Sequence, residues 1–174
     1  SEDSKTTTVF LREGVKWSDG EPFTADDFVF WFEDLYNNPD VVPTGIADMS
    51  VNGKPGRVVK VDDYTVNFEF DDPYPLFIAM LAGDTLIGGG QSVRQARGRT
   101  FGAYSPAHYL KQFLPKYSSE EEVNQMAADE GYENWVQLVH FKKDWTLNPE
   151  LPTVGPFKTV QPINTPNWVM ERNP

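Results

Sequence analysis

Short stretches in which hydrophobic and polar residues alternate predict several β-strands along the chain. The first stretch, residues 6–12, is rich in β-branched and aromatic side chains and places Val9 and Leu11 on one face. Two further stretches, residues 157–161 and 168–172, show strand-like patterns near the end of the chain. The pattern therefore predicts one strand near the start and a pair of strands at the close.

A β-hairpin is predicted around Asp62-Asp63, because apolar residues alternate on both sides of this pair. If the pair forms a two-residue turn, Val61 lies opposite Tyr64 and Val59 lies opposite Val66. This register places six apolar side chains on one face of the hairpin, namely Val59, Val61, Tyr64, Val66, Phe68 and Phe70.

Hydrophobic residues at helical spacing predict five helices, of which the clearest covers residues 25–36. Thr24 and Asp27 form a capping-box pattern at its start, and Phe23 and Phe28 fit a hydrophobic staple. The other four helices are expected over residues 76–82, 106–113, 120–130 and 132–141, the third behind a second capping box and ahead of Gly131. Residues 39–56, 84–104 and 144–156 are expected to form loops. The order of elements indicates a mixed α/β (α+β) fold with antiparallel strand pairs.

Length and composition narrow the class of protein. The 174 residues have a mass of 19.7 kDa, which suits one domain or one lobe of a larger molecule. The 26 acidic residues outnumber the 15 basic ones and give a net charge of −11, which argues against nucleic-acid binding. Without cysteine the chain has neither disulfides nor a zinc–cysteine site. No stretch has the length and apolar character of a membrane span or a signal peptide. Because neither end is closed by a structural element, we expect an excised piece of a longer protein.

Paired carboxylates raise the alternative of a small acid-dependent hydrolase. Asp26 and Glu33 are the pair that this alternative uses. A glycosidase needs two carboxylates across a cleft, one of them kept protonated by burial. Capping explains Asp26 and Asp27 equally well, so we expect the chain not to be an enzyme.

The sequence predicts neither a metal site nor a cofactor. His108 and His140 are the only histidines, and neither has a second ligand at helical spacing. No nucleophile-elbow motif accompanies them. Gly88-Gly89-Gly90 lacks the lysine and the serine or threonine that follow in a phosphate-binding loop.

Three residues are candidates for contact with a ligand. Trp17 and Trp145 lie in a turn and a loop, where an aromatic side chain is free to meet a sugar or a peptide. Arg94 belongs to a basic group with Arg97 and Arg99 that suits an anionic ligand group or a partner surface. If that basic loop is ordered at a partner surface, a third alternative is a self-contained protein-interaction module.

Residues 10–30 resemble the signature of the family 5 extracellular solute-binding proteins. This stretch runs from Phe10-Leu11-Arg12-Glu13-Gly14 through Trp17-Ser18-Asp19-Gly20 to Phe28-Val29-Phe30. These proteins are the receptors of ABC importers for oligopeptides, dipeptides, nickel and some oligosaccharides. The resemblance continues in order through four further blocks: Val61-Asp62-Asp63-Tyr64-Thr65-Val66, Pro73-Tyr74-Pro75-Leu76-Phe77, Ser105-Pro106-Ala107-His108-Tyr109-Leu110 and Gly155-Pro156-Phe157-Lys158, and it ends at Glu171-Arg172-Asn173-Pro174. The family usually has a tyrosine in place of Phe157.

The resemblance implies part of a type II periplasmic-binding-protein-like fold with two lobes. Residues 6–156 then form the small subdomain and a segment of the N-terminal lobe, with a helical insert at about 117–150. Residues 157–174 are expected to be strands that return to the main lobe, and the distal lobe is expected to be absent. Most of the family's ligand-gripping residues lie outside these blocks, so the resemblance assigns no binding residue.

The resemblance also implies a function and a location. The chain is expected to be a fragment of a receptor that captures a peptide or an oligosaccharide by lobe closure and delivers it to an ABC permease. Its place is expected to be the periplasm or the cell exterior, with a lipid anchor to the cell surface as one option. Removal of the lobe contacts is expected to expose apolar surface, which self-association of the fragment can cover.

Overall fold

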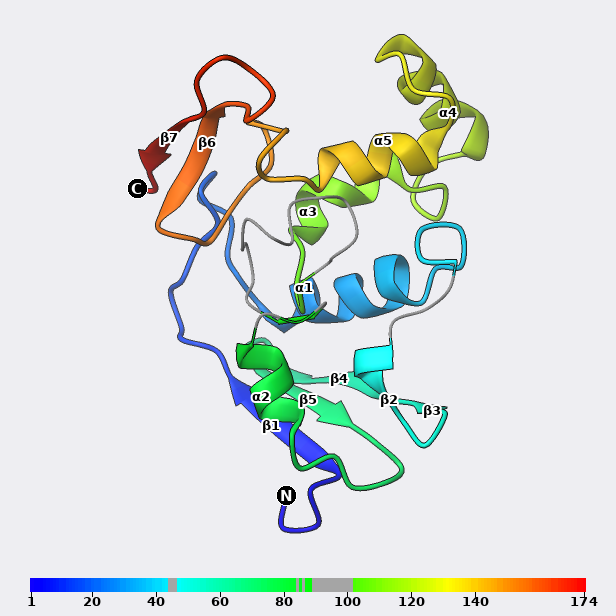
Figure 1. The fold of residues 1–174 in the computed structure, drawn as a ribbon, viewed down its shortest axis with the longest axis vertical. Helices are drawn as coiled ribbons and strands as arrows, with labels where there is room; N and C mark the ends of the chain where they lie inside the picture. The colour runs from blue at the N-terminus through cyan, green and yellow to red at the C-terminus, as the bar shows by residue number, and fades with distance from the viewer. Residues whose placement is uncertain (44–46, 84, 86, 89–101) are drawn as a thin grey trace.

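The computed structural model describes residues 1–43, 47–83, 85, 87–88 and 102–174, and it has the mixed α/β (α+β) architecture that the sequence predicts (Figure 1). In chain order its elements are β1 (Thr6–Phe10), α1 (Ala25–Phe30), η1 (Trp31–Tyr36), η2 (Ala47–Met49), β2 (Ser50–Val51), β3 (Lys54–Pro55), β4 (Arg57–Asp62), β5 (Thr65–Glu69), α2 (Phe77–Ala82), α3 (Ala107–Leu110), η3 (Lys111–Phe113), α4 (Glu120–Asp129), α5 (Trp135–Lys142), β6 (Phe157–Gln161) and β7 (Val169–Arg172).

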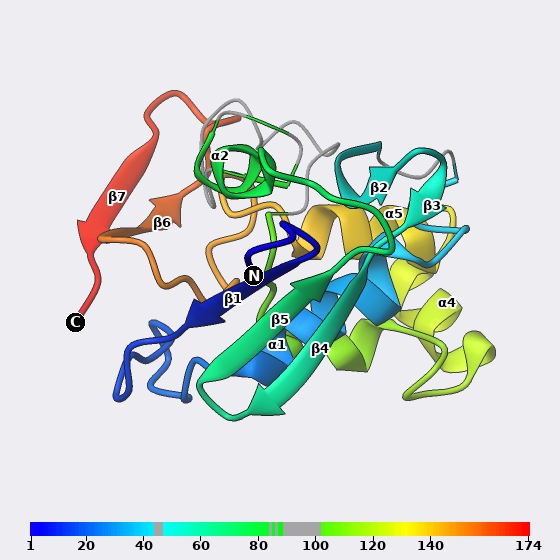
Figure 2. The same ribbon diagram turned by 90° about the horizontal axis from the view of Figure 1, so that it is seen from below.

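A three-stranded antiparallel sheet in the order β1-β5-β4 forms one side of the molecule (Figure 2). Helix α1 lies against one face of this sheet, and α3 and α5 lie on the far side of α1 (Figure 1). β1 is therefore an edge strand, and its partner β5 is the central strand. The β6–β7 hairpin stands apart from the sheet at the other end of the molecule.

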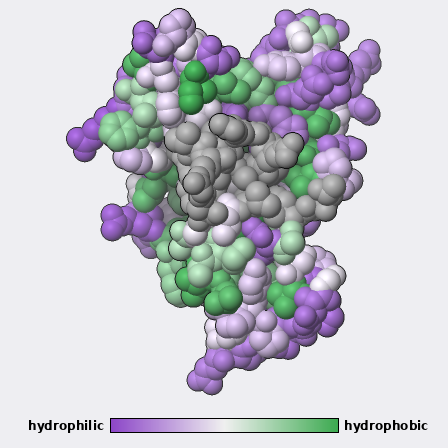
Figure 3. Space-filling model, viewed as in Figure 1, coloured by the Kyte–Doolittle hydropathy of each residue, from purple (hydrophilic) through white to green (hydrophobic). Residues whose placement is uncertain are grey.

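The short helix α2 leaves most of its apolar surface uncovered. Its residues are all hydrophobic, yet only Phe77 is buried, while Ile78 is 66% exposed and Leu76, just before the helix, is 67% exposed. Figure 3 shows hydrophobic side chains gathered over this helix. An exposed apolar surface of this kind marks a place where a further element or molecule packs.

The predicted helix over residues 25–36 is present, but its second half is π-helical. Thr24 and Asp27 form the predicted capping box, and the rings of Phe23 and Phe28 lie 5.6 Å apart, as the predicted staple requires. The π-helical segment η1 was not predicted. This segment is buried on nearly all sides, since residues 30–32 and 34–36 are all buried, and Asp34 among them accepts hydrogen bonds from Lys116 and Tyr117.

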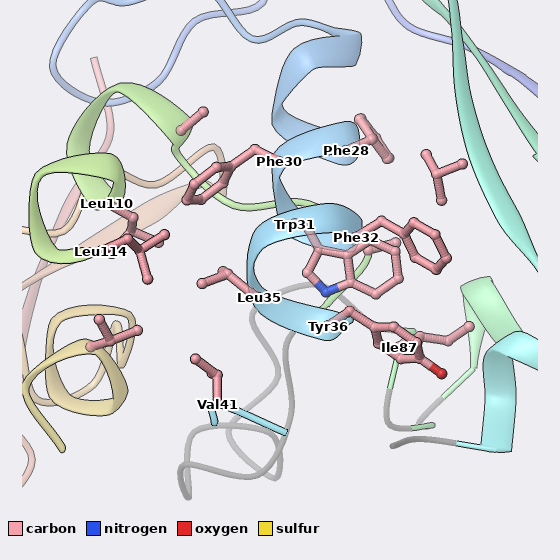
Figure 4. Packing of buried hydrophobic residues seen from close by; sticks show 14 of the residues in the cluster. Phe28, Phe30, Trp31, Phe32, Leu35, Tyr36, Val41, Ile87, Leu110 and Leu114 are labelled. Carbon is pink, nitrogen blue, oxygen red and sulfur yellow. The ribbon is translucent and has the colours of Figure 1, made fainter. Parts of the chain in front are cut away.

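The hydrophobic core lies on both sides of α1 and η1. In Figure 4, Phe30 and Leu35 point toward Leu110 and Leu114. Phe28 and Phe32 point in the opposite direction in the same figure, the side on which the ring of Phe28 meets that of Phe68 in β5. This one helical segment therefore joins the sheet to the helical layer.

The predicted hairpin is present, but its predicted register is wrong. Asp62 pairs with Thr65, Lys60 pairs with Val66, and a bulge falls between Lys60 and Asp62. The turn therefore lies at residues 63–64, one position later than predicted, and the Asp62 carboxylate accepts the Tyr64 N–H at 2.8 Å. As a result Val59 and Val61, expected on the buried face, are exposed, and Val58 is buried instead.

Helices α4 and α5 follow the capping signals of their own residues. Ser119 and Glu122 form the predicted capping box of α4, and Gly131, with a φ of +84°, follows its end as predicted. Helix α5 begins at Trp135, later than predicted, because the Asn134 side chain accepts the Gln137 N–H and caps the helix there. The nearly buried ammonium of Lys142 bonds to Glu130 at 2.9 Å and joins the two helices.

Candidate functional site

A cavity of about 720 Å³ opens between the turn that precedes α1 and the segments that flank the β6–β7 hairpin. Its walls come from residues 14 and 16–20, 154–156 and 172–174. The first of these segments is more than 130 positions from the other two in the sequence, and folding brings it beside them. A cavity of this size is in the range that small-molecule ligands occupy.

The first wall is a tight turn whose backbone is fixed at both ends. The Gly20 N–H donates to the Trp17 carbonyl at 2.9 Å, and the Trp17 N–H donates to the Glu21 carbonyl at 2.8 Å. Gly20 has a φ of +96°, a conformation that glycine adopts without strain. Asp19 at the tip of this turn reaches α3, where its carboxylate lies 2.8 Å from Nε2 of His108.

Trp17 is a buried anchor of this wall. Its side chain is 3% exposed, and its indole N–H donates to Oδ2 of Asp27 at 3.0 Å. Asp27 also accepts the backbone N–H of Thr24 at 3.0 Å and that of Ala107 at 3.1 Å. Burial raises the pKa of the Asp27 carboxyl, and these three donors offset part of the rise. The Asp27 carboxylate thus holds the turn, α1 and α3 in one arrangement.

The second wall is held to the first by hydrogen bonds in both directions. The Ser18 N–H donates to the Thr153 carbonyl at 2.9 Å, and the Thr153 N–H donates to the Ser18 hydroxyl at 3.1 Å. The Asn173 amide then donates to the carbonyls of Thr153 and Gly155 at 3.0 and 2.6 Å. Its Oδ1 is buried and has no hydrogen-bond partner among the described residues.

The cavity combines polar, charged and aromatic groups. Charges of both signs come from Lys16, Asp19 and Arg172. Gly14 and Gly20, which also line the cavity, are exposed and offer backbone groups. Such a mixture can hydrogen-bond a polar solute and neutralise a charged group on it. These groups provide binding chemistry.

The three residues predicted to contact a ligand lie in different places. Trp17 lines the cavity, although its indole is buried and bonded to Asp27. Trp145 lies away from the cavity wall, half-buried beside Trp168 with ring centroids 5.5 Å apart. Arg94 lies outside the described residues, as do Arg97 and Arg99. Of the two predicted residues that the structure describes, only Trp17 therefore lines the cavity.

The carboxylates of the hydrolase alternative are not arranged across this cavity. The Asp26 side chain is 61% exposed and bonds to Nζ of Lys60 at 2.8 Å. Glu33 is exposed on the same helical segment, and neither residue lines the cavity. No group of three or more histidine, aspartate or glutamate side chains within the described ranges could hold a metal ion. In those ranges, no helix has the length and apolar character that a membrane span requires.

Ser18, Thr153 and Asn173 were not predicted as site residues. Ser18 and Asn173 both belong to the blocks that carry the family resemblance, which was the available signal. The resemblance gives the order of the blocks but not which of them meet in space. Only the folded chain shows that the first and the last block line the same cavity.

A family model for bacterial extracellular solute-binding proteins, family 5 (Middle), matches residues 1–174. The periplasmic alpha-galactoside-binding protein of Rhizobium meliloti is 35% identical over 120 residues, which is 68% of this chain and 15% of that protein.

Two solved structures are similar over nearly the whole chain. An oligopeptide-binding protein OppA has a TM-score of 0.81 and 38% identity, covering 99% of this chain and 24% of its own. The periplasmic binding protein MelB of Agrobacterium fabrum, solved in complex with stachyose, has a TM-score of 0.66 and 27% identity, covering 99% of this chain and 22% of its own. The chain therefore spans at most about a quarter of these three proteins.

Proposed function

Because the chain belongs to the family 5 bacterial extracellular solute-binding proteins, we propose that it is part of the receptor that delivers a solute to an ABC permease. The observation that carries this proposal is the match over the whole chain, which extends to the three-dimensional arrangement at a TM-score of 0.81. Every block of the chain takes part in the match, so the proposal does not depend on one motif.

The proposed solute is a peptide or an oligosaccharide. The relatives support both, because one is an oligopeptide-binding protein and another an alpha-galactoside-binding protein. The cavity beside Trp17 offers hydrogen-bonding groups and charges of both signs, which suit either class. We propose binding without catalysis, since the described carboxylates Asp26 and Glu33 are not paired across a cleft.

The proposed mechanism is closure of two lobes around the solute. Residues 6–156 would form the small subdomain and a segment of the first lobe, with the helical insert at about 117–150. The β6–β7 hairpin would return to the main lobe. Its exposed apolar side chains, among them Phe157, Val160 and Met170, support this role because an isolated two-stranded hairpin is marginally stable. The distal lobe would be supplied by polypeptide outside these residues.

The proposed location is the periplasm or the outside of the cell, with a lipid anchor as one form of attachment. The family description and the periplasmic relatives support this location.

An uptake assay tests the function most simply. Cells from which the gene is deleted are given labelled peptides and labelled oligosaccharides, and the proposal predicts that uptake of at least one of these solutes is lost. Restoring the gene should restore uptake, and unchanged uptake of every solute in the panel would contradict the proposal.

Self-association is the expected behaviour of these 174 residues on their own. Apolar side chains at Leu76 and Ile78, and on the hairpin at Phe157, are exposed. Sedimentation velocity over a range of protein concentrations should show a mass that increases with concentration. A monomer at all concentrations would refute this expectation.

A further inference from the structure

Asn52 and Gly53 form the exposed two-residue turn that joins β2 to β3. Val51 pairs with Lys54 across this turn, and φ is positive at both turn residues, +51° at Asn52 and +75° at Gly53. Positive φ at both central residues is the requirement of a type I′ turn, which an asparagine followed by a glycine satisfies readily. Asn52 is the only asparagine in the sequence that a glycine follows.

The glycine leaves the side chain of Asn52 accessible to the backbone that follows it. A side chain on the following residue would hinder the approach of its nitrogen to the asparagine amide, and glycine has none. The space around Gly53 is also open, because a Cβ at this position would meet no described atom within 4 Å apart from those of Asn52 and Lys54. A bond between the Gly53 nitrogen and Cγ of Asn52 closes a five-membered ring, and reacting groups joined in this way have a high effective concentration.

The turn is held in place by few interactions. β2 and β3 form two residue pairs, and one of these pairs contains Pro55, which has no N–H to donate. The side-chain amide of Asn52 donates to the Asp72 carboxylate at 3.3 Å, and this bond is exposed to solvent. Because hairpins this short are marginally stable, we expect the turn to open locally while the core stays folded.

We propose that Asn52 is a site of spontaneous deamidation in the folded protein. The deprotonated Gly53 nitrogen attacks Cγ of Asn52, a C–N bond forms, and the bond from Cγ to Nδ2 breaks with ammonia as the leaving group. Water then opens the resulting cyclic imide at either of its carbonyls, which gives aspartate or isoaspartate at position 52. One water is consumed and one ammonia is released, so the reaction needs neither an oxidant nor an enzyme. Because it also needs no solute, it is independent of the proposed function.

The reaction changes both the charge and the length of the turn. Aspartate at position 52 places a new carboxylate near Asp72, where the Asn52 amide donates a hydrogen bond, so an attraction is replaced by repulsion between like charges. Lys54 already pairs with Asp72 at 3.2 Å, and its single charge cannot neutralise two carboxylates. Isoaspartate adds one atom to the main chain between Val51 and Lys54, whose pairing requires a two-residue turn. We therefore expect the modification to separate β2 from β3.

Incubation of the folded protein at about pH 8, followed by proteolysis and mass spectrometry of the peptides, tests the proposal. Asn52 should be converted to a mixture of aspartate and isoaspartate, which electron-transfer fragmentation distinguishes. Asn134 is the internal control, because it is also exposed but is followed by Trp135, and its side-chain oxygen accepts the Gln137 N–H at 3.0 Å. Asn134 should remain an amide over the same period. No conversion at Asn52, or equal conversion at the two sites, would overturn the proposal.

A matched variant tests whether this asparagine is the source of the new charge. Asn52→Gly keeps the positive φ without strain and carries no amide. Anion-exchange chromatography should show acidic species that accumulate with time in the parent protein and that the variant does not form. Equal accumulation of acidic species in the two proteins would contradict the proposal.

A comparison with the unfolded chain tests the part played by the structure. Conversion of Asn52 in the folded protein should be at most about tenfold slower than in guanidinium chloride, because the turn opens at low cost. If Asn52 stays intact in the folded protein while the unfolded chain reacts, the turn protects this residue and the proposal fails.

Discussion

At the scale of single residues, Asp27 is the side chain on which the arrangement of the candidate site most depends. Its carboxylate accepts three N–H donors, from Trp17, Thr24 and Ala107, and these donors belong to the turn, the helix cap and α3. A buried N–H donor that loses its acceptor stays out of contact with water and has no hydrogen bond in compensation, which destabilises the folded state. Asp27 therefore couples the stability of the core to the shape of the cavity wall.

Replacement of Asp27 by Ala should lower the free energy of unfolding by about 2–4 kcal/mol, because it removes a cap and leaves three N–H groups without their acceptor. The matched control is Asp26→Ala, one residue earlier in the same helical turn. The Asp26 side chain is 61% exposed and forms an ion pair with Lys60, so its loss should cost about 1 kcal/mol or less. Urea unfolding followed by tryptophan fluorescence measures both, and equal losses would contradict the role given to Asp27.

The raised pKa of Asp27 predicts a dependence on pH. Its folded pKa lies above the ordinary value of 3.8, so between the two pKa values the folded protein binds more protons than the unfolded chain. The stability that protonation of Asp27 adds to the folded state is thus fully present below pH 3.8 and is lost as the pH rises through the folded pKa. The free energy of unfolding of the parent chain minus that of Asp27→Asn should therefore decrease as the pH rises.

This difference isolates Asp27, because the other carboxyl groups titrate in both proteins. Urea unfolding of both at constant ionic strength, from pH 3 to pH 7, gives the measurement. One unit of pKa shift corresponds to a change of about 1.4 kcal/mol over the series. A difference that increases with pH would show that the folded pKa is lowered.

At the scale of elements, the sequence predicted the kinds and order of most helices and strands, and it failed where tertiary contacts decide. The capping boxes at Thr24 and Ser119 act within one turn of chain, so their residues suffice to locate the helix starts. The hairpin register depends on the bulge at Val61 and on the Asp62 carboxylate, which accepts the Tyr64 N–H. Strict alternation of apolar residues cannot reveal a bulge, because a bulge breaks that alternation.

The observed register of the hairpin and the alternating sequence pattern predict opposite effects of mutation at Val58 and Val61. Val58 is 7% exposed and Val61 is 56% exposed. Val58→Ala should lower the free energy of unfolding by about 1–3 kcal/mol, whereas Val61→Ala should change it by about 0.5 kcal/mol or less. Thermal or urea unfolding of the two variants decides between the registers. A larger loss of stability in Val61→Ala than in Val58→Ala would support the two-residue turn at Asp62-Asp63 instead.

The same limit applies to the candidate site. Trp17 could be selected from the sequence because it lies in a turn with a glycine, but its burial under Tyr104 and His108 depends on α3. Asn173 could not be selected, because an asparagine near a strand end has many ordinary roles. Its bonds to Thr153 and Gly155 exist only when the two ends of the last segment approach each other.

At the scale of the whole molecule, the chain combines a well-packed centre with uncovered apolar surfaces at both ends. Trp31 and Leu35 are fully buried between the sheet and the helices. By contrast, α2, β1 and the β6–β7 hairpin present exposed apolar side chains, among them Ile78, Phe10 and Phe157. This distribution is what a segment of a larger two-lobed receptor requires, since its surfaces must meet other parts of the same protein.

The most direct test of the receptor account is a calorimetric titration with a panel of peptides and oligosaccharides. It compares the 174 residues alone with the longest natural polypeptide that contains them. The account predicts that the longer polypeptide binds at least one solute with a Kd of about 1 μM or tighter. These residues alone should bind that solute at least about a hundredfold more weakly, because part of the contact surface is missing. Equal affinity of the two proteins, or no binding by the longer one to any solute in the panel, would contradict the account.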